Sequence, residues 1–178
     1  MNIVLSLLLS TSLTHHAFVS RRLPEHRLPS TIRIKLDRRF PGWRFAQVSA
    51  EIRRAMKEYT SPDSQLNLVR GDFDGDGRTD YALLIEHGNI FNGAGVNIGR
   101  NNHIVAFLKR GAGYRAYLVD SNAGNYLLLW RKGDKGFSYE TQKNFVFAKD
   151  AIEAVIFEKA GTYYIYEKGK FRRVTTGD

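Results

Sequence analysis

The chain has 178 residues, of which 43% are hydrophobic and 25% are charged, and its formal net charge is +9. This length and composition are typical of one globular domain with a sizeable buried core, and they exclude a disordered chain. The sequence contains no cysteine, which excludes disulfides, thiolate metal sites and cysteine nucleophiles.

Residues 1–20 have the pattern of a secretory signal sequence. The stretch Met1–Ser10 is apolar, and the first charged residue is Arg21. This apolar run is too short to span a bilayer. The pattern predicts a secreted or periplasmic protein with no transmembrane helix in the mature chain, and a buried strand is the alternative structure for this segment.

Residues 21–45 are expected to form a basic, partly irregular arm. Three of the four prolines in the chain fall here, and the alternation of polar and apolar residues over Thr31–Leu36 predicts one short strand. Basic side chains outnumber acidic ones over residues 21–58. Such an excess suits an anionic glycan or cell surface as partner, with lipid headgroups or nucleic acid as further anionic surfaces, and a solvated basic face is the simpler alternative. The sequence has no specific nucleic-acid-binding motif.

A helix is predicted over residues 46–59. Val48, Ile52, Met56 and Tyr59 recur at three- and four-residue steps, with charged residues mostly between them. This spacing places the apolar side chains on one face of a helix. We expect it to be the only substantial helix, at the start of a single domain that runs from residue 46 to residue 178.

Strands and turns are predicted for the rest of the chain. One strand is expected before an acidic stretch and another after it, at 66–70 and 81–86, followed by a loop rich in Gly and Asn at 88–102. Further on, hairpins are expected over 103–119, 126–141 and 163–175, with one more strand at 151–157. These elements predict an α+β fold, mainly an antiparallel β meander with one N-terminal amphipathic helix.

The acidic stretch, residues 72–80, has the spacing of a calcium-binding loop. Aspartates stand at its first, third, fifth and ninth positions, and Gly77 at the sixth permits a sharp turn. Carboxylates this close repel one another unless a hard cation such as Ca²⁺ neutralises them. A solvated acidic turn is the alternative. The expected ligands are the carboxylates of Asp72, Asp74, Asp76 and Asp80 and the backbone carbonyl of Arg78.

The loop differs from a helical EF-hand. Its twelfth position is Leu83 instead of Glu, and the residues after it favour a strand. The stretch Gly71–Ile85 resembles the FG-GAP/VCBS repeat of integrin-type proteins, in a single copy that covers about residues 66–86. The resemblance implies calcium held by the five residues named above, in a secreted and mostly non-catalytic β protein. A single copy in a chain of this length excludes a complete propeller.

Two histidines and a set of aromatic residues are further candidate functional residues. His87 and His103 flank the Gly/Asn-rich stretch, where they would form either an acid/base or transition-metal pair, or strand ends that face solvent. The aromatic residues would form either a platform for stacking sugars or cross-strand pairs in the core. They are Tyr126, Trp130, Phe137, Tyr163, Tyr164 and Tyr166.

The function expected from these features is that of a secreted, non-catalytic, calcium-stabilised binding domain. Its contact surface would be the stretch 88–102 together with the basic turns of the hairpins, and its ligand an anionic glycan or cell surface. One alternative is a calcium-dependent hydrolase of a phosphate ester or glycan, with His87 or His103 as general base. Another is a subunit of a larger extracellular assembly.

Overall fold

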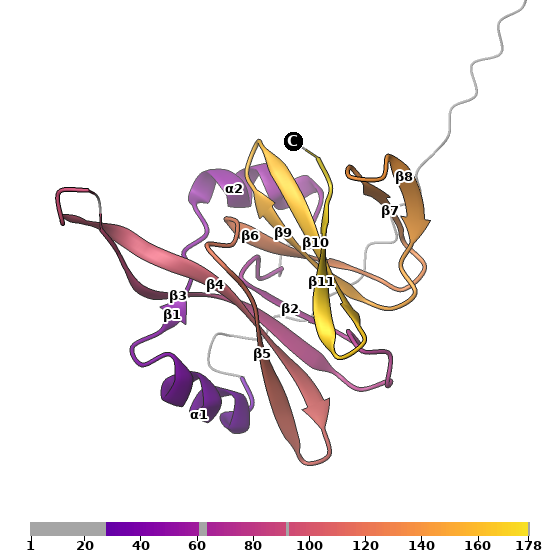
Figure 1. Cartoon of the computed structure of the whole chain (residues 1–178), viewed down its shortest axis with the longest axis horizontal. Helices are drawn as coiled ribbons and strands as arrows, with labels where there is room; N and C mark the ends of the chain where they lie inside the picture. The colour runs from indigo at the N-terminus through magenta and orange to yellow at the C-terminus, as the bar shows by residue number, and fades with distance from the viewer. Residues whose placement is uncertain (1–27, 61–63, 92, 178) are drawn as a thin grey trace, which may run out of the picture.

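Most of the chain forms antiparallel strands (Figure 1). A computed structural model describes residues 28–60, 64–91 and 93–177, so the expected signal sequence lies outside the described residues. The helices are α1 (Ser30–Arg39) and α2 (Ala50–Ala55), and the 3-10 turn Met56–Glu58 continues α2. The strands are β1 (Arg44–Phe45), β2 (Leu68–Gly71), β3 (Asp80–Phe91), β4 (Asn97–Arg110), β5 (Gly113–Ser121), β6 (Tyr126–Trp130), β7 (Lys135–Ser138), β8 (Lys143–Val146), β9 (Ala151–Ile156), β10 (Ala160–Glu167) and β11 (Lys170–Thr175).

The described strands form two main sheets and a separate hairpin. In sheet A the order is β1-β3-β4-β5, and β2 pairs with the first residues of β3, on either side of the acidic loop. In sheet B the order is β11-β10-β9-β6, while β7 and β8 pair only with each other. The expectation of a fold built mainly from antiparallel strands is therefore confirmed, although β6 leaves the simple meander order to pair with β9.

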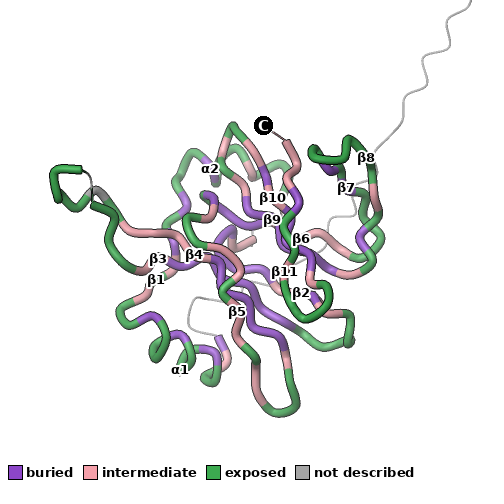
Figure 2. Tube along the Cα trace, viewed as in Figure 1, coloured by how far each residue is buried: buried purple, intermediate pink, exposed green. Residues whose placement is uncertain are grey.

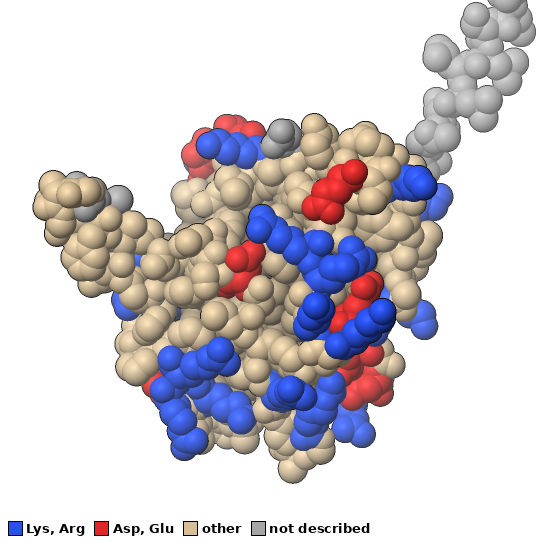
Figure 3. Space-filling view, in the orientation of Figure 1, with Lys and Arg blue, Asp and Glu red and all other residues tan. Residues whose placement is uncertain are grey.

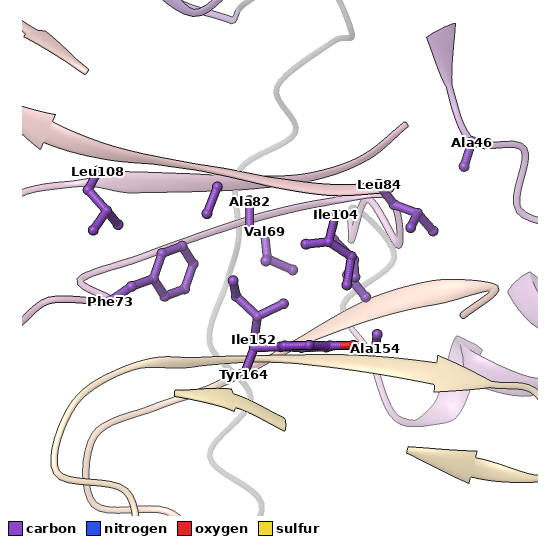
Figure 4. Close-up of a cluster of buried hydrophobic side chains, with 12 residues drawn as sticks. Ala46, Val69, Phe73, Ala82, Leu84, Ile104, Leu108, Ile152, Ala154 and Tyr164 are labelled. Atoms are coloured by element: carbon purple, nitrogen blue, oxygen red, sulfur yellow. The ribbon is translucent and has the colours of Figure 1, made fainter. Parts of the chain in front are cut away.

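The main hydrophobic core lies between sheets A and B (Figure 4). Alternate residues along each strand point into it, because successive side chains of a strand face opposite sides of the sheet. The fully buried ring of Phe73, from within the acidic loop, is part of this core. Sheet A contributes Val69, Ala82, Leu84, Ile104, Ala106 and Leu108, and sheet B contributes Leu127, Ile152, Ala154 and Tyr164.

Each sheet is also covered on its outer face. Helix α1 packs on sheet A through Ile32 and Leu36, which are fully buried among residues that include Leu83 and Phe107. On sheet B, α2 covers one part of the outer face, and the β7–β8 hairpin covers another. The result is a β-sandwich with a helix outside each sheet, in which both faces of the central strands are buried.

The strand predicted at Thr31–Leu36 is wrong, because this segment belongs to α1. Its alternation of polar and apolar residues suits a strand, but the side chains that reach sheet A recur every four residues, from Leu28 through Ile32 and Leu36 to Phe40. The intervening Ile34 is 57% exposed. Within the helix expected over 46–59, the structure has α2 and its 3-10 turn over residues 50–58, and α1 is a second helix that was not expected.

The hairpin predicted over 126–141 is also wrong. Strand β6 pairs with β9, which is distant in sequence, and β7 pairs with β8. Leu127 explains this choice, since its side chain is 1% exposed in the core between the sheets. Burial of β6 at the edge of sheet B outweighs the local turn residues that favoured a hairpin.

The stretch 88–102 is not a loop, because β3 and β4 continue through most of it. They pair from Tyr81 with Phe107 out to Phe91 with Asn97, and register shifts occur between His87 and Asn89 and between Ile90 and Phe91. Gly88, at the first shift, has a φ of 73°. Such a bulge bends a strand and increases its twist.

Candidate calcium site

The acidic loop connects β2 to β3, and Gly71 pairs with Asp80 at its base. Inside the loop the Asp72 carboxylate accepts hydrogen bonds from the backbone N–H groups of Gly75 and Asp76 at 2.9 Å, and from that of Gly77 at 2.9 Å. Gly75 and Gly77 each have a φ of 81°, which favours glycine. The local sequence therefore closes the loop around one carboxylate.

Three of the predicted ligands converge. One carboxylate oxygen from each of Asp72, Asp74 and Asp80 lies within 4.8 Å of the others. Two oxygens bound to one Ca²⁺ at 2.3–2.6 Å are at most about 5 Å apart. The arrangement of these three side chains fits a single calcium ion.

Asp80 is the most buried of the three, with no exposed surface. Its carboxylate accepts hydrogen bonds from the N–H groups of Phe73 at 3.0 Å and Lys109 at 2.7 Å. Burial, together with the nearby charges of Asp74 and Asp76, raises the pKa of Asp80 to about 6. The two backbone donors oppose this rise without cancelling it. A nearby cation would favour the charged form of this carboxylate.

Asp76 and Arg78 are less well supported as ligands. The Asp76 carboxylate lies outside the converging group, and its Oδ2 is 3.5 Å from Arg110 Nη1 and 3.9 Å from Arg78 Nε. Its Oδ1 accepts a hydrogen bond from the Arg78 N–H at 2.9 Å. These two predicted ligands therefore stay predictions, while the other three are brought together.

Arg110, at the end of β4, is a part of the site that the sequence motif does not indicate. Its guanidinium forms an ion pair with Asp74, whose side chain is 6% exposed, and a second, longer one with Asp76. The hydrogen bond that Arg110 donates to the Asp74 carboxylate raises the pKa of Arg110. Arg110 thus places one positive charge against two loop carboxylates. No local pattern reveals it, because the contact depends on how β4 pairs with β3.

Lys149 and Asp150, which come just before β9, tie the loop to sheet B. Asp150 accepts a hydrogen bond from the Asp72 N–H at 3.0 Å, and Lys149 Nζ donates to the Asp74 carbonyl at 3.1 Å. A Cβ on Gly71 would lie 2.8 Å from Asp150 Oδ2, so glycine permits this approach. We call residues 71–80, with these contacts and the buried Phe73, the latch between the sheets.

His87 and His103 are at the opposite end of sheet A from the latch. Both ring nitrogens of His103 have local partners, the Ser121 hydroxyl and the His87 carbonyl, each at 3.1 Å. Lys109, which contacts Asp80, is six positions after His103 on β4, and six positions of a strand span about 20 Å. The two histidines lie near each other, with ring centroids 6.1 Å apart, but away from the acidic loop.

The aromatic residues are mostly part of the core. Tyr126, Tyr163 and Tyr164 are at most 5% exposed, so they do not present flat faces for a sugar. Trp130 packs edge-on against Tyr163, and its Nε1 donates to Glu153. Phe137, on β7, is the most exposed of the set at 36%. The cross-strand alternative describes these residues better than the platform.

None of the described helices has the length and apolar character needed to span a membrane. Comparisons of the chain with protein-family models, with curated proteins and with solved structures find no significant match. The resemblance of Gly71–Ile85 to an FG-GAP/VCBS repeat therefore rests on its motif, and the geometry of the carboxylates is the main evidence on the site.

Proposed function

We propose that this chain is a calcium-stabilised, non-catalytic binding module that is secreted or periplasmic. The observation that carries the proposal is the convergence of Asp72, Asp74 and Asp80 between two paired strands. Calcium outside the cell is at millimolar concentration, and calcium loops of extracellular modules bind the ion with dissociation constants of about 0.1–1 mM. Such a loop would therefore be occupied outside the cell.

The ion would be held by the oxygens of Asp72, Asp74 and Asp80, with Asp76 and the Arg78 carbonyl as the further ligands expected from the motif. The ion would add positive charge among these carboxylates, because the single charge of Arg110, which pairs with Asp74 and Asp76, neutralises them only in part. A seven-coordinate cation that accepts flexible oxygen ligands suits this loop better than Mg²⁺, which requires a tighter octahedron.

The proposed role of the ion is structural. The loop is linked to sheet B by Lys149 and Asp150, and its Phe73 ring lies in the core between the sheets. Fixing the carboxylates would therefore stabilise the packing of the two sheets as well as one hairpin. We expect calcium to raise the stability of the whole domain.

A binding role is favoured over a catalytic one. The histidines proposed as general bases, His87 on β3 and His103 on β4, lie about 20 Å along their strands from the acidic loop. His103 also has partners at both ring nitrogens. The net charge of +9 favours an anionic ligand, such as a glycan or a cell surface.

Thermal melting with 1 mM CaCl₂ or with EGTA tests the proposal. If calcium is present at about 100 times its dissociation constant, it should stabilise the protein by about 2.7 kcal/mol. Asp74→Asn should abolish this difference. Glu51→Gln removes one exposed carboxylate from α2, away from the loop, and should leave the difference intact. Identical melting of the unmodified protein in calcium and in EGTA would overturn the proposed role of the ion.

A further inference from the structure

Strands β3 and β4 extend beyond the rest of sheet A as a two-stranded ribbon (Figure 1). On one side β1 pairs only with Ile85 and Glu86, and on the other β5 reaches no further along β4 than His103. Residues 88–91 and 93–99, which we call the arm, are therefore held by strand pairing within the ribbon alone. A two-stranded ribbon is at best marginally stable in water.

The arm exposes apolar side chains and carries no charge. Figure 2 shows it as mostly exposed, and Ile90, Phe91 and Val96 are 36%, 59% and 57% exposed. No Lys, Arg, Asp or Glu occurs between His87 and Arg100, although 25% of the chain is charged. A projecting, uncharged segment with apolar side chains near its turn is typical of a contact surface.

Basic side chains lie beside the base of the arm. The end of α1 meets it there, since the ring of Phe40 packs edge-on against His87 with centroids 5.4 Å apart, and Arg100 Nη2 donates to the Gly42 carbonyl at 2.9 Å. Helix α1 has four exposed basic residues. Its single acidic residue, Asp37, accepts a hydrogen bond from Trp43 Nε1. The four basic residues are Arg33, Lys35, Arg38 and Arg39.

The space-filling view shows the two features on one side of the molecule. In Figure 3 the arm has no blue or red atoms, and blue side chains gather near α1 below it. The ribbon from His87 to its turn spans five residues, or roughly 16 Å. The uncharged apolar tip of the arm therefore projects about this distance from its base, beside the basic residues of α1.

We propose that the arm and α1 together dock on an anionic lipid bilayer. The tip, with Phe91 and Val96, enters the boundary between headgroups and acyl chains, and the basic residues of α1 contact the headgroups. The unpaired edges of the ribbon keep it out of the hydrocarbon core, where backbone groups need partners. This inference rests on the proposed function, of which it names the ligand class.

A lipid surface accounts for both parts of the arrangement. An anionic glycan would contact the basic residues of α1 but would leave the apolar tip exposed to water. A second copy of the chain would cover the apolar tip but would bring like charges together on α1.

Co-sedimentation with phosphatidylcholine vesicles, with or without about one third phosphatidylglycerol, tests the proposal. The protein should bind the anionic vesicles more tightly than the neutral ones. The double substitution Phe91→Ser/Val96→Ser should weaken binding roughly ten-fold through lost apolar burial. The matched control Tyr139→Ser/Val146→Ser alters two side chains of the β7–β8 hairpin that are 45% and 59% exposed, and it should have no effect.

A second pair of variants tests the basic residues. Arg38→Gln/Arg39→Gln on α1 should weaken binding to anionic vesicles roughly ten-fold. Arg53→Gln/Arg54→Gln removes the same charge from consecutive exposed arginines of α2, on the other side of the sandwich, and should change binding little. Thermal melting of every variant establishes that it is folded.

Three outcomes would overturn the inference. One is an equal loss of binding in the arm variant and its control. Another is binding to an anionic glycan such as heparin, but not to vesicles, which would leave the proposed function standing. The third is self-association that Phe91→Ser/Val96→Ser abolishes, measured by light scattering. Calcium-independent melting with normal vesicle binding would instead overturn the proposed role of calcium alone.

Discussion

The two ends of β3 lie in opposite environments. At its start, Asp80 has no exposed surface and belongs to the latch, where carboxylates, Arg110 and the buried Phe73 meet. At its end, Phe91 is 59% exposed in an arm with no charged residue. One end is thus stabilised by contacts distant in sequence, and the other by pairing within its own ribbon. In our proposal, a single strand thus serves both the stability of the domain and its contact with a ligand.

The largest expected effect on stability comes from truncating Phe73 in the latch, and Phe91 in the arm is the comparison. Phe73→Ala removes a fully buried ring from the core between the sheets and should lower the free energy of unfolding by about 3–5 kcal/mol. Phe91→Ala should change it by about 0.5 kcal/mol or less, since the ring is exposed. Urea denaturation in EGTA measures both. Similar losses for the two variants would contradict the contrast between latch and arm.

A smaller effect is expected from the carboxylates within the latch. Both oxygens of Asp80 accept backbone hydrogen bonds, whereas an asparagine offers only one acceptor oxygen. In EGTA, Asp80→Asn should therefore cost about 1–3 kcal/mol from the N–H group left without a partner, reduced by relief of the burial and repulsion that raise the pKa of Asp80. Asp76→Asn is the matched control, because that side chain is 33% exposed and lies outside the converging group. A latch that tolerated Asp80→Asn as well as Asp76→Asn would not depend on this buried carboxylate.

Among the latch variants, the smallest effect is expected from Arg110→Gln. The ion pair with Asp74 is partly solvated on the arginine side, where the side chain is 41% exposed, so its loss should cost about 1 kcal/mol or less in EGTA. The rise in melting temperature on adding calcium should become larger than in the unmodified protein, because Asp74 then lacks its other cation. Arg115→Gln on β5, whose guanidinium lies over the Tyr117 ring, is the control. An unchanged calcium response would show that Arg110 does not compete with the ion.

The sequence predicts what is local in the site. The spacing of Asp72, Asp74 and Asp80 places their carboxylates together because the loop folds on itself through the turns at Gly75 and Gly77. The motif does not predict Asp150 as part of the site, since Asp150 is 78 positions from Asp72 in the sequence. Its contact depends on how the two sheets pack.

The same division between local and distant interactions explains the fold. The antiparallel strands beside the acidic loop and the β10–β11 hairpin follow from alternation and turn residues. Helix α1 does not, because Thr31–Leu36 alternates like a strand while its buried side chains follow a four-residue spacing. The Gly and Asn content of residues 88–102 predicts a loop, although backbone pairing within 89–91 and 97–102 forms strands there.

The bulge at the base of the arm has a mechanical consequence. The register of β3 and β4 shifts between His87 and Asn89, and Gly88 there has a φ of 73°. A ribbon is most easily bent where its ladder of hydrogen bonds is interrupted. If the tip of the arm is bound and pulled, we expect the ribbon to bend mainly at Gly88. The strand around Asp80, at the other end of β3, would then move little. Gly88 would then act as a flexure that isolates the latch from loads on the arm.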